Sequence, residues 1–228
     1  KRAINFNIAP TTVNPNFNKN RDGEEYSYFQ PIGSIDLSNY EGDFVGFFKG
    51  VNIDTLEVIC DKSFTQTDFS YCFYEATIEN ESTLTSLLYK IANVTNLDYC
   101  FYKTSIDDVN IVLNNIIIGN NVKMNYTFAE CYNLSTLNGI TIPNRVSEIE
   151  GLFNNCPIVS ITNLDVNVKG SVKGLFSGCN RLKTVTNLTM PYATDMSSLF
   201  ENCISLTSVI GFTVPNSCEN LNSTFRNC

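Results

Sequence analysis

The chain contains neither histidine nor tryptophan among its 228 residues. Without an imidazole, it lacks the side chain that titrates near neutrality and most often serves as a general base or a metal ligand. This absence excludes the usual base of most hydrolytic mechanisms, and it removes histidine from any metal site.

Positive charge is also scarce, because 15 lysines and arginines face 23 aspartates and glutamates, for a net charge of −8. A chain with this charge repels a phosphate backbone, so nucleic acid is not an expected partner. No apolar run is long enough to span a membrane, and no signal peptide is present, so we expect no membrane insertion. Because the chain starts without Met and stops at RNC, we expect a processed protein or a fragment.

What the sequence does contain is a phenylalanine that recurs every 23 to 28 residues. Eight copies form one column, which comprises Phe48, Phe73, Phe101, Phe128, Phe153, Phe176, Phe200 and Phe225. An internal period of this length is the sequence signature of a solenoid or a related repeat architecture.

Two further columns accompany the phenylalanines. The residue four positions earlier is always apolar, in the order Phe44, Phe69, Leu97, Met124, Ile149, Val172, Met196 and Leu221. The residue three positions later is always compact, in the order Val51, Ala76, Thr104, Cys131, Cys156, Cys179, Cys203 and Cys228. Because positions i, i+4 and i+7 share one helix face, this spacing predicts about two helical turns in each copy.

Downstream of the phenylalanine, the apolar spacing changes to that of a strand. The segments ITIP, LTMP and FTVP at 140–143, 188–191 and 212–215 have apolar residues two apart and close on a proline. Since proline cannot donate to a ladder, each segment predicts a very short strand that ends there. A second short strand is expected just before each, and Leu164 and Val166 take the strand positions in the fifth copy.

A unit of this size cannot bury its apolar face alone, so the units must stack into a solenoid. We predict an α/β repeat solenoid of about eight coils over residues 31–228, with a short strand ladder and short helical turns. Residues 1–30 are expected to form an N-terminal cap or tether. The last coil has no strand after it, so the solenoid is expected to be truncated at its C-terminus.

The runs DMSSLFENCISLTSV (195–209), VKGLFSGCNRLKTVTNL (172–188) and IDLSNY (35–40) resemble the BspA-like class of leucine-rich repeats. The resemblance covers residues 32–228 and is weakest in the second and third copies, where the spacing is longer. It implies a right-handed leucine-rich-repeat solenoid with one strand ladder per coil. It also implies a surface protein of bacteria, some protists or bacteriophage-related particles, used for attachment rather than chemistry.

The cysteine column has two interpretations. Five sulfurs on successive coils could bind a soft metal or form disulfides, or the column could simply need a compact buried side chain. Val51, Ala76 and Thr104 in the same column favour packing, because they cannot act as ligands. Cys72 and Cys100 form a second small column, for which a disulfide remains an alternative.

No arrangement of residues indicates catalysis or a cofactor. The best carboxylate pairs, Asp107 with Asp108 and Glu148 with Glu150, have no complementary partner nearby in the sequence. The candidate ligand-binding residues are instead the outward-facing strand positions, which form a mostly threonine stripe of Thr141, Asp165, Thr189 and Thr213. Strand propensity alone would also explain these threonines.

The first functional hypothesis is a non-catalytic binding or adhesion module, displayed on a bacterial cell or phage surface. It would engage a protein or glycan on a host or neighbouring cell through the solenoid surface. The alternative is a structural spacer or a component of a larger particle, such as a phage tail fibre or a capsid-associated protein. In that case flanking domains or subunits would stack on the C-terminal coil.

Overall fold

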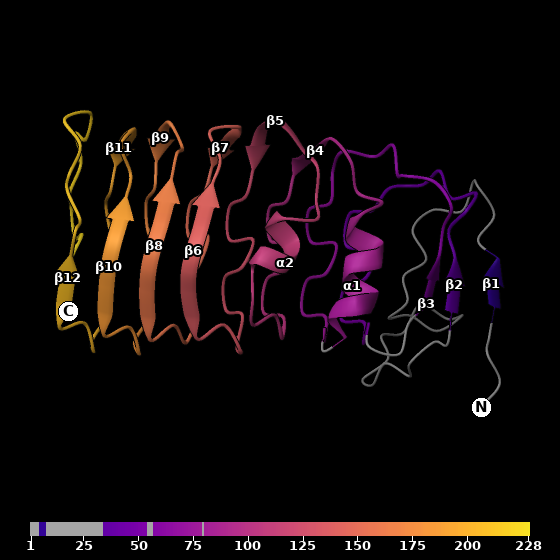
Figure 1. Ribbon diagram of the computed structural model, residues 1–228, viewed down its shortest axis with the longest axis horizontal. Coiled ribbons are helices and arrows are strands. Elements are labelled where there is room, and N and C mark those ends of the chain that lie inside the picture. The colour runs from indigo at the N-terminus through magenta and orange to yellow at the C-terminus, as the bar shows by residue number, and fades with distance from the viewer. Residues whose placement is uncertain (1–4, 8–33, 54–56, 79) are drawn as a thin grey trace, which may run out of the picture.

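The computed structural model describes residues 5–7, 34–53, 57–78 and 80–228. Its coils stack side by side into a long solenoid, with strand β1 (Asn5–Asn7) at one end and the C-terminus at the other (Figure 1). The predicted repeat solenoid is confirmed.

The strands are short, and every strand pair that the described residues form is parallel. The strands after β1 are β2 (Ser34–Asp36), β3 (Glu57–Ile59), β4 (Val94–Asn96), β5 (Ile118–Lys123), β6 (Thr136–Ile142), β7 (Val146–Glu148), β8 (Ser160–Val166), β9 (Gly170–Ser171), β10 (Thr184–Thr189), β11 (Ala193–Asp195) and β12 (Ser208–Ile210). The main sheet has the order β12-β10-β8-β6, and two smaller sheets contain β4-β5-β7 and β9-β11. Strands β1, β2 and β3 form a fourth sheet.

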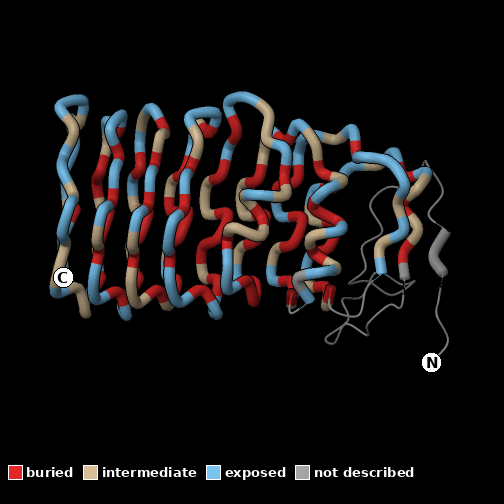
Figure 2. Tube along the Cα trace, in the orientation of Figure 1, coloured by how far each residue is buried: buried red, intermediate tan, exposed pale blue. Residues whose placement is uncertain are grey.

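The main sheet joins the two short strands that were expected in each coil into one. In β6, Leu137, Ile140 and Ile142 are buried and the residues between them are exposed, and Figure 2 shows the same alternation in the neighbouring coils. Leu137 and Ile140 are three residues apart because Gly139 has a φ of 65°, which turns the strand between these two buried residues. Asn163 and Asn187 repeat this left-handed conformation in β8 and β10.

The strand predicted at FTVP is wrong, because β12 ends at Ile210, before Phe212. Likewise, β10 ends within LTMP, at Thr189. Strand β12 is the outer strand of its sheet and pairs only with β10. The residues that follow it therefore have no strand on their outer side with which to form hydrogen bonds.

The phenylalanine column forms the centre of the core. Consecutive rings stack with centroids 4.9 to 5.9 Å apart through all eight coils. Every ring from Phe48 to Phe200 is fully buried, whereas Phe225 in the last coil is 48% exposed. The eight rings mark about seven full turns of the solenoid, against the eight coils expected.

The helical turns expected around each phenylalanine are turns of another kind. The residue two positions before each phenylalanine and the residue two positions after it both have positive φ. The residues before are Gly46, Tyr71, Tyr99, Tyr126, Gly151, Gly174, Ser198 and Ser223. The residues after are Gly50, Glu75, Lys103, Glu130, Asn155, Gly178, Asn202 and Asn227. The two left-handed residues of each coil lie four positions apart, and a right-handed α-helix cannot accommodate them. The apolar spacing is right, but the backbone alternates between right- and left-handed conformations.

This alternation directs the backbone hydrogen bonds. The N–H of Phe153 donates to the carbonyl of Leu175 in the next coil at 3.0 Å, while the N–H of Asn154 donates locally to Gly151 at 2.9 Å. The same pattern recurs in the other coils, so every second amide joins two coils. The turns therefore form a ladder of their own, which a helix could not, since its amides are consumed internally.

Two helices occur where the repeat is longest. Helix α1 (Glu81–Leu88) and helix α2 (Asn110–Leu113) lie in the second and third copies, where strands take that place in later coils. Asn80 caps α1, because its side chain accepts a hydrogen bond from the N–H of Thr83 at 3.2 Å. The extra residues of these copies are therefore used to form helices.

The predicted N-terminal cap or tether, residues 1–30, lies almost entirely outside the described residues. Only β1 within it is described, and β1 pairs in parallel with β2. The cap stays a prediction.

Candidate functional site

The predicted threonine stripe is partly assembled. Thr141 of β6 pairs with Asp165 of β8, which in turn pairs with Thr189 of β10, and all three are exposed. The hydroxyl of Thr189 donates to Asp165 Oδ1 at 2.6 Å. Thr213 is also exposed, but it lies after β12 and outside the sheet.

The cysteine column is packing with an added hydrogen bond. The four residues from Cys131 to Cys203 are buried, and Cys228 lies in the last coil. Each thiol donates to the carbonyl of the phenylalanine in the preceding coil at 3.0 to 3.2 Å. The described residues contain no cluster of acidic, cysteine or histidine side chains that could hold a metal ion, and all nine cysteines, Cys72 and Cys100 included, are free thiols.

Burial keeps these thiols protonated. Desolvation raises the pKa of Cys131 to about 11 and that of Cys203 to about 12, and it raises the pKa of Cys156 and Cys179 as well. Because the thiolate is the nucleophile and the metal ligand, these cysteines are unreactive at neutral pH.

The two carboxylate pairs are engaged in ordinary surface contacts. Asp108 accepts a hydrogen bond from the N–H of Asn110 at 2.9 Å. Hydrogen bonds from Asn125 and Lys123 lower the pKa of Glu148, and Glu150 forms an ion pair with Lys173 at 3.0 Å. Neither pair has the arrangement of two carboxyl groups that act together on one substrate.

The turn ladder carries a surface that sequence reasoning missed. Five tyrosines occupy two columns on it, Tyr71, Tyr99 and Tyr126 two residues before the phenylalanine, and Tyr74 and Tyr102 one residue after it. We call these five residues the tyrosine ladder. Rings within a column stack with centroids 4.9 to 5.1 Å apart, and the two columns touch, with centroids 5.7 to 5.8 Å apart.

Charged side chains border the tyrosine ladder and largely neutralise one another. Lys49 Nζ lies 4.7 Å from the centroid of Tyr74, and Lys103 pairs with Glu75 at 3.1 Å. At the other end, the hydroxyl of Tyr126 donates to Glu150 Oε1 at 3.3 Å. Tyr71 is 40% exposed and the other four rings are partly exposed, so the ladder presents ring edges and hydroxyl groups to solvent.

The ladder could have been found from the sequence. The segments YCFYE (71–75), YCFYK (99–103) and YTFAE (126–130) place tyrosine at the same distance from the column phenylalanine. This recurrence becomes visible when every position of the repeat is aligned, and not only the apolar and compact columns.

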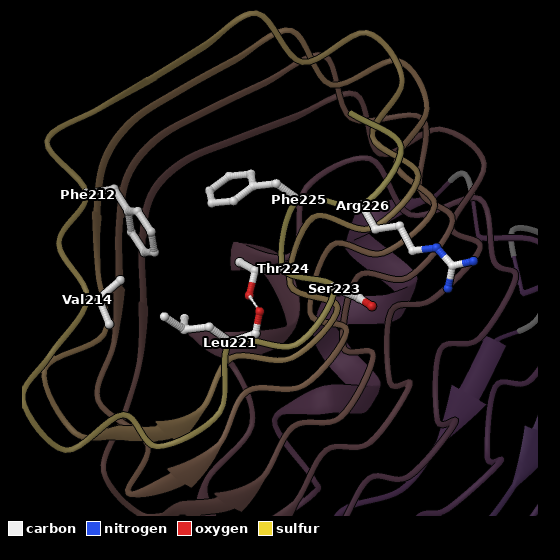
Figure 3. A pocket seen from close by; sticks show the side chains of 7 residues that line it. All are labelled: Phe212, Val214, Leu221, Ser223, Thr224, Phe225 and Arg226. Atoms are coloured by element: carbon white, nitrogen blue, oxygen red, sulfur yellow. Dashed lines mark hydrogen bonds between the residues drawn. The ribbon is translucent and has the colours of Figure 1, made fainter.

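A third feature is an apolar pocket at the end of the last coil. It has a volume of about 500 Å³ and is lined by Phe212, Val214, Leu221, Ser223, Thr224, Phe225 and Arg226 (Figure 3). The residues one coil earlier at the same repeat positions, such as Leu188, Met196 and Phe200, are fully buried. The pocket is therefore the uncovered interior of a coil. In the described part of the chain, no helix is both long and apolar enough to traverse a bilayer.

Comparison with known proteins bears on the repeat alone. No curated protein and no solved structure matches the chain. The family described as the BspA type leucine-rich repeat region matches residues 95–228 in six copies, which is more than half of the chain. Such regions are commonly adhesion or protein-binding repeats of surface proteins, and repeat solenoids of this kind are typically non-catalytic. The chain belongs to the BspA-type leucine-rich repeat family.

Proposed function

We propose that the chain is a non-catalytic binding module, displayed outside a cell or on a virion, that engages a protein on a host or neighbouring cell through the tyrosine ladder. The observation that carries this proposal is the use of tyrosine at three successive left-handed positions, Tyr71, Tyr99 and Tyr126, with φ of 53 to 57°. In other coils glycine or serine stands at this position.

Stability alone does not account for these tyrosines. A left-handed conformation costs a residue with a side chain about 1–2 kcal/mol relative to glycine. A stacked aromatic pair returns about 0.5–1.5 kcal/mol, so the two terms nearly cancel. Tyrosine is therefore close to neutral for folding here, while it is among the residues most enriched at protein interfaces and in their hot spots.

The charge pattern supports a protein rather than a polyanion as the partner. The ion pairs at the border of the ladder, Glu75 with Lys103 and Glu150 with Lys173, are exposed and mutually satisfied, and the chain carries a net charge of −8. A rim of polar and charged groups around aromatic side chains is the usual anatomy of a protein interface. The stripe of Thr141, Asp165, Thr189 and Thr213 stays a second proposed contact surface on the strand face.

The test is a binding screen of the intact 228-residue chain against an array of extracellular proteins, with purified glycans on the same array. We expect saturable binding to one or a few proteins, abolished by unlabelled chain in excess. Absence of saturable binding to any protein would contradict the proposal.

A second candidate function is that of a structural spacer or a component of a larger particle. The apolar pocket at the end of the last coil supports it. Phe225 and Leu221 are 48% and 49% exposed there, although their equivalents in earlier coils are buried. Such a surface suits a stacked domain or subunit. Analytical ultracentrifugation of the chain with Phe225→Ser as the comparison tests it, since a spacer would self-associate or bind its neighbour through this end only.

A further inference from the structure

A second pocket lies where the main sheet is interrupted. Strand β6 is the edge of that sheet, because the preceding coil has helix α2 rather than a strand beside it (Figure 1). A cavity of about 250 Å³ lies at this junction, lined by Asn110, Leu113, Asn114, Ile118, Met124, Gly139, Thr141 and Pro143. It contains Thr141, the first residue of the predicted stripe.

The lining combines apolar walls with a few unused polar groups. Leu113, Ile118 and Pro143 supply apolar surface, and none of the eight residues is charged. Within the described part of the chain, the side chains of Asn110, Asn114 and Thr141 form no hydrogen bond. Thr189, by contrast, uses its hydroxyl on Asp165.

The backbone beside the pocket is also open. No backbone hydrogen bond joins the outer edge of β6 to α2 among the described residues. A Cβ placed on Gly139 would meet no atom within 4 Å, although asparagine stands at the equivalent left-handed positions 163 and 187. A side chain at position 139 would therefore project into open space at the mouth of the pocket that Gly139 lines.

We infer that this pocket is a glycan subsite that holds one neutral pyranose ring. Apolar side chains pack against the C–H face of a sugar, while two amides and a hydroxyl pair with its hydroxyl groups. Sites for drug-sized ligands measure about 300–1,000 Å³, so this cavity suits a single ring. A uronic or sialic acid is disfavoured, because the lining contains no cationic side chain to pair with the carboxylate of such a sugar, and the protein itself carries a net charge of −8.

The subsite is independent of the tyrosine ladder, since the two share no residue. It would let the module bind a glycan and a protein at separate places. Either proposal can therefore fail while the other stands.

The experiment is a titration of the isotopically labelled intact chain with N-acetylglucosamine, galactose and glucose, followed by amide and side-chain NMR shifts. We expect at least one of these sugars to bind saturably and to shift the signals of Asn110, Asn114 and Gly139. The double variant Asn110→Ala/Asn114→Ala should weaken binding about tenfold or more, and Thr141→Val a few-fold, as expected for lost hydrogen bonds. Thr184→Val, at an exposed position of β10 outside both the pocket and the threonine stripe, is the matched control and should bind as the parent does.

Gly139→Asn is a second variant that keeps the backbone intact, because the same conformation holds asparagine in the next two coils. It narrows the mouth of the pocket and should also weaken sugar binding. The inference is overturned if none of the three sugars shifts the lining residues, if glucuronic acid binds more tightly than they do, or if the Asn110→Ala/Asn114→Ala variant binds sugar unchanged. The same variant should retain binding to any protein partner of the tyrosine ladder.

Discussion

Each buried cysteine of the repeat serves two purposes at once. Its sulfur fills a compact space beside the phenylalanine stack, and its S–H donates to the phenylalanine carbonyl one coil back. Thr104 occupies the same column, but its hydroxyl donates to the carbonyl of Phe101 in its own coil at 3.0 Å. The column thus favours small side chains, and a weak donor is an advantage. Burial also protects these column thiols from oxidation.

Cys179→Ala tests the packing role. Loss of the sulfur and its hydrogen bond should lower the free energy of unfolding by about 1–2 kcal/mol. Urea denaturation measures this, and binding to the partner should be unaffected. A variant of unchanged stability that has lost binding would show that the column is a site after all.

Phe176→Ala tests the centre of the stack. The ring is fully buried between Phe153 and Phe200, so its removal should cost about 3–5 kcal/mol. Phe225→Ala is the matched control, because that ring is half exposed and should cost clearly less. Equal losses at the two positions in urea denaturation would mean that the stack does not contribute by burial.

Alkaline pH should destabilise the fold through the same thiols. Burial raises the pKa of Cys131 to about 11 in the folded state, so as the pH rises the unfolded chain loses this proton first, near its ordinary pKa of about 8.5. Between these values each pH unit should cost about 1.4 kcal/mol for this residue. Urea midpoints measured from pH 7 to pH 10 should fall above pH 8.5, and Cys131→Ala should reduce the slope. A flat profile would contradict the assigned burial.

At the scale of the element, the turn ladder replaces the helix that the apolar spacing suggested. Spacing of i, i+4 and i+7 places three side chains on one side of a short segment, and both structures satisfy it. The difference lies in the backbone, where left-handed residues flank each phenylalanine. Glycine and asparagine at several of these positions, such as Gly174, Gly178 and Asn155, are the sequence signal that distinguishes them.

Asn202 offers a direct test of this ladder, since it has a φ of 62° and an exposed side chain. Asn202→Val should destabilise the chain by about 1–2 kcal/mol, because a β-branched residue is strained in this conformation. Asn202→Gly should change the stability by a few tenths of a kcal/mol at most. If thermal or urea unfolding shows valine to be as well tolerated as glycine, the position is not left-handed.

At the scale of the whole molecule, the repeat determined what could be predicted. The column of phenylalanines fixed the stacking, and Ile140 and Ile142 correctly marked the buried face of β6. The helices α1 and α2 were not foreseen, because they lie in the two copies whose spacing departs from the pattern. The tyrosine ladder was missed because exposed residues do not have to repeat, and only stacking across coils makes them a surface.

The repeat architecture also explains why the residues proposed for binding differ from those that stabilise the fold. Inward positions repeat from coil to coil and hold the solenoid together, whereas outward positions vary without cost to the core. The tyrosine ladder spans three coils and the sugar pocket lies at a break in the sheet. Both are local departures from the repeat on a regular scaffold.

The most direct test of the account is the affinity of the protein partner for a variant without the left-handed tyrosines. Tyr71, Tyr99 and Tyr126 are each changed to glycine, the residue found at this position in other coils, so the variant should remain folded. Tyr132→Ala, which alters a tyrosine that is 50% exposed outside the ladder, is the control. Measured by surface plasmon resonance, the triple variant should bind at least about tenfold more weakly than the control. Equal affinities, with both proteins folded, would contradict the proposal that the ladder is the binding surface.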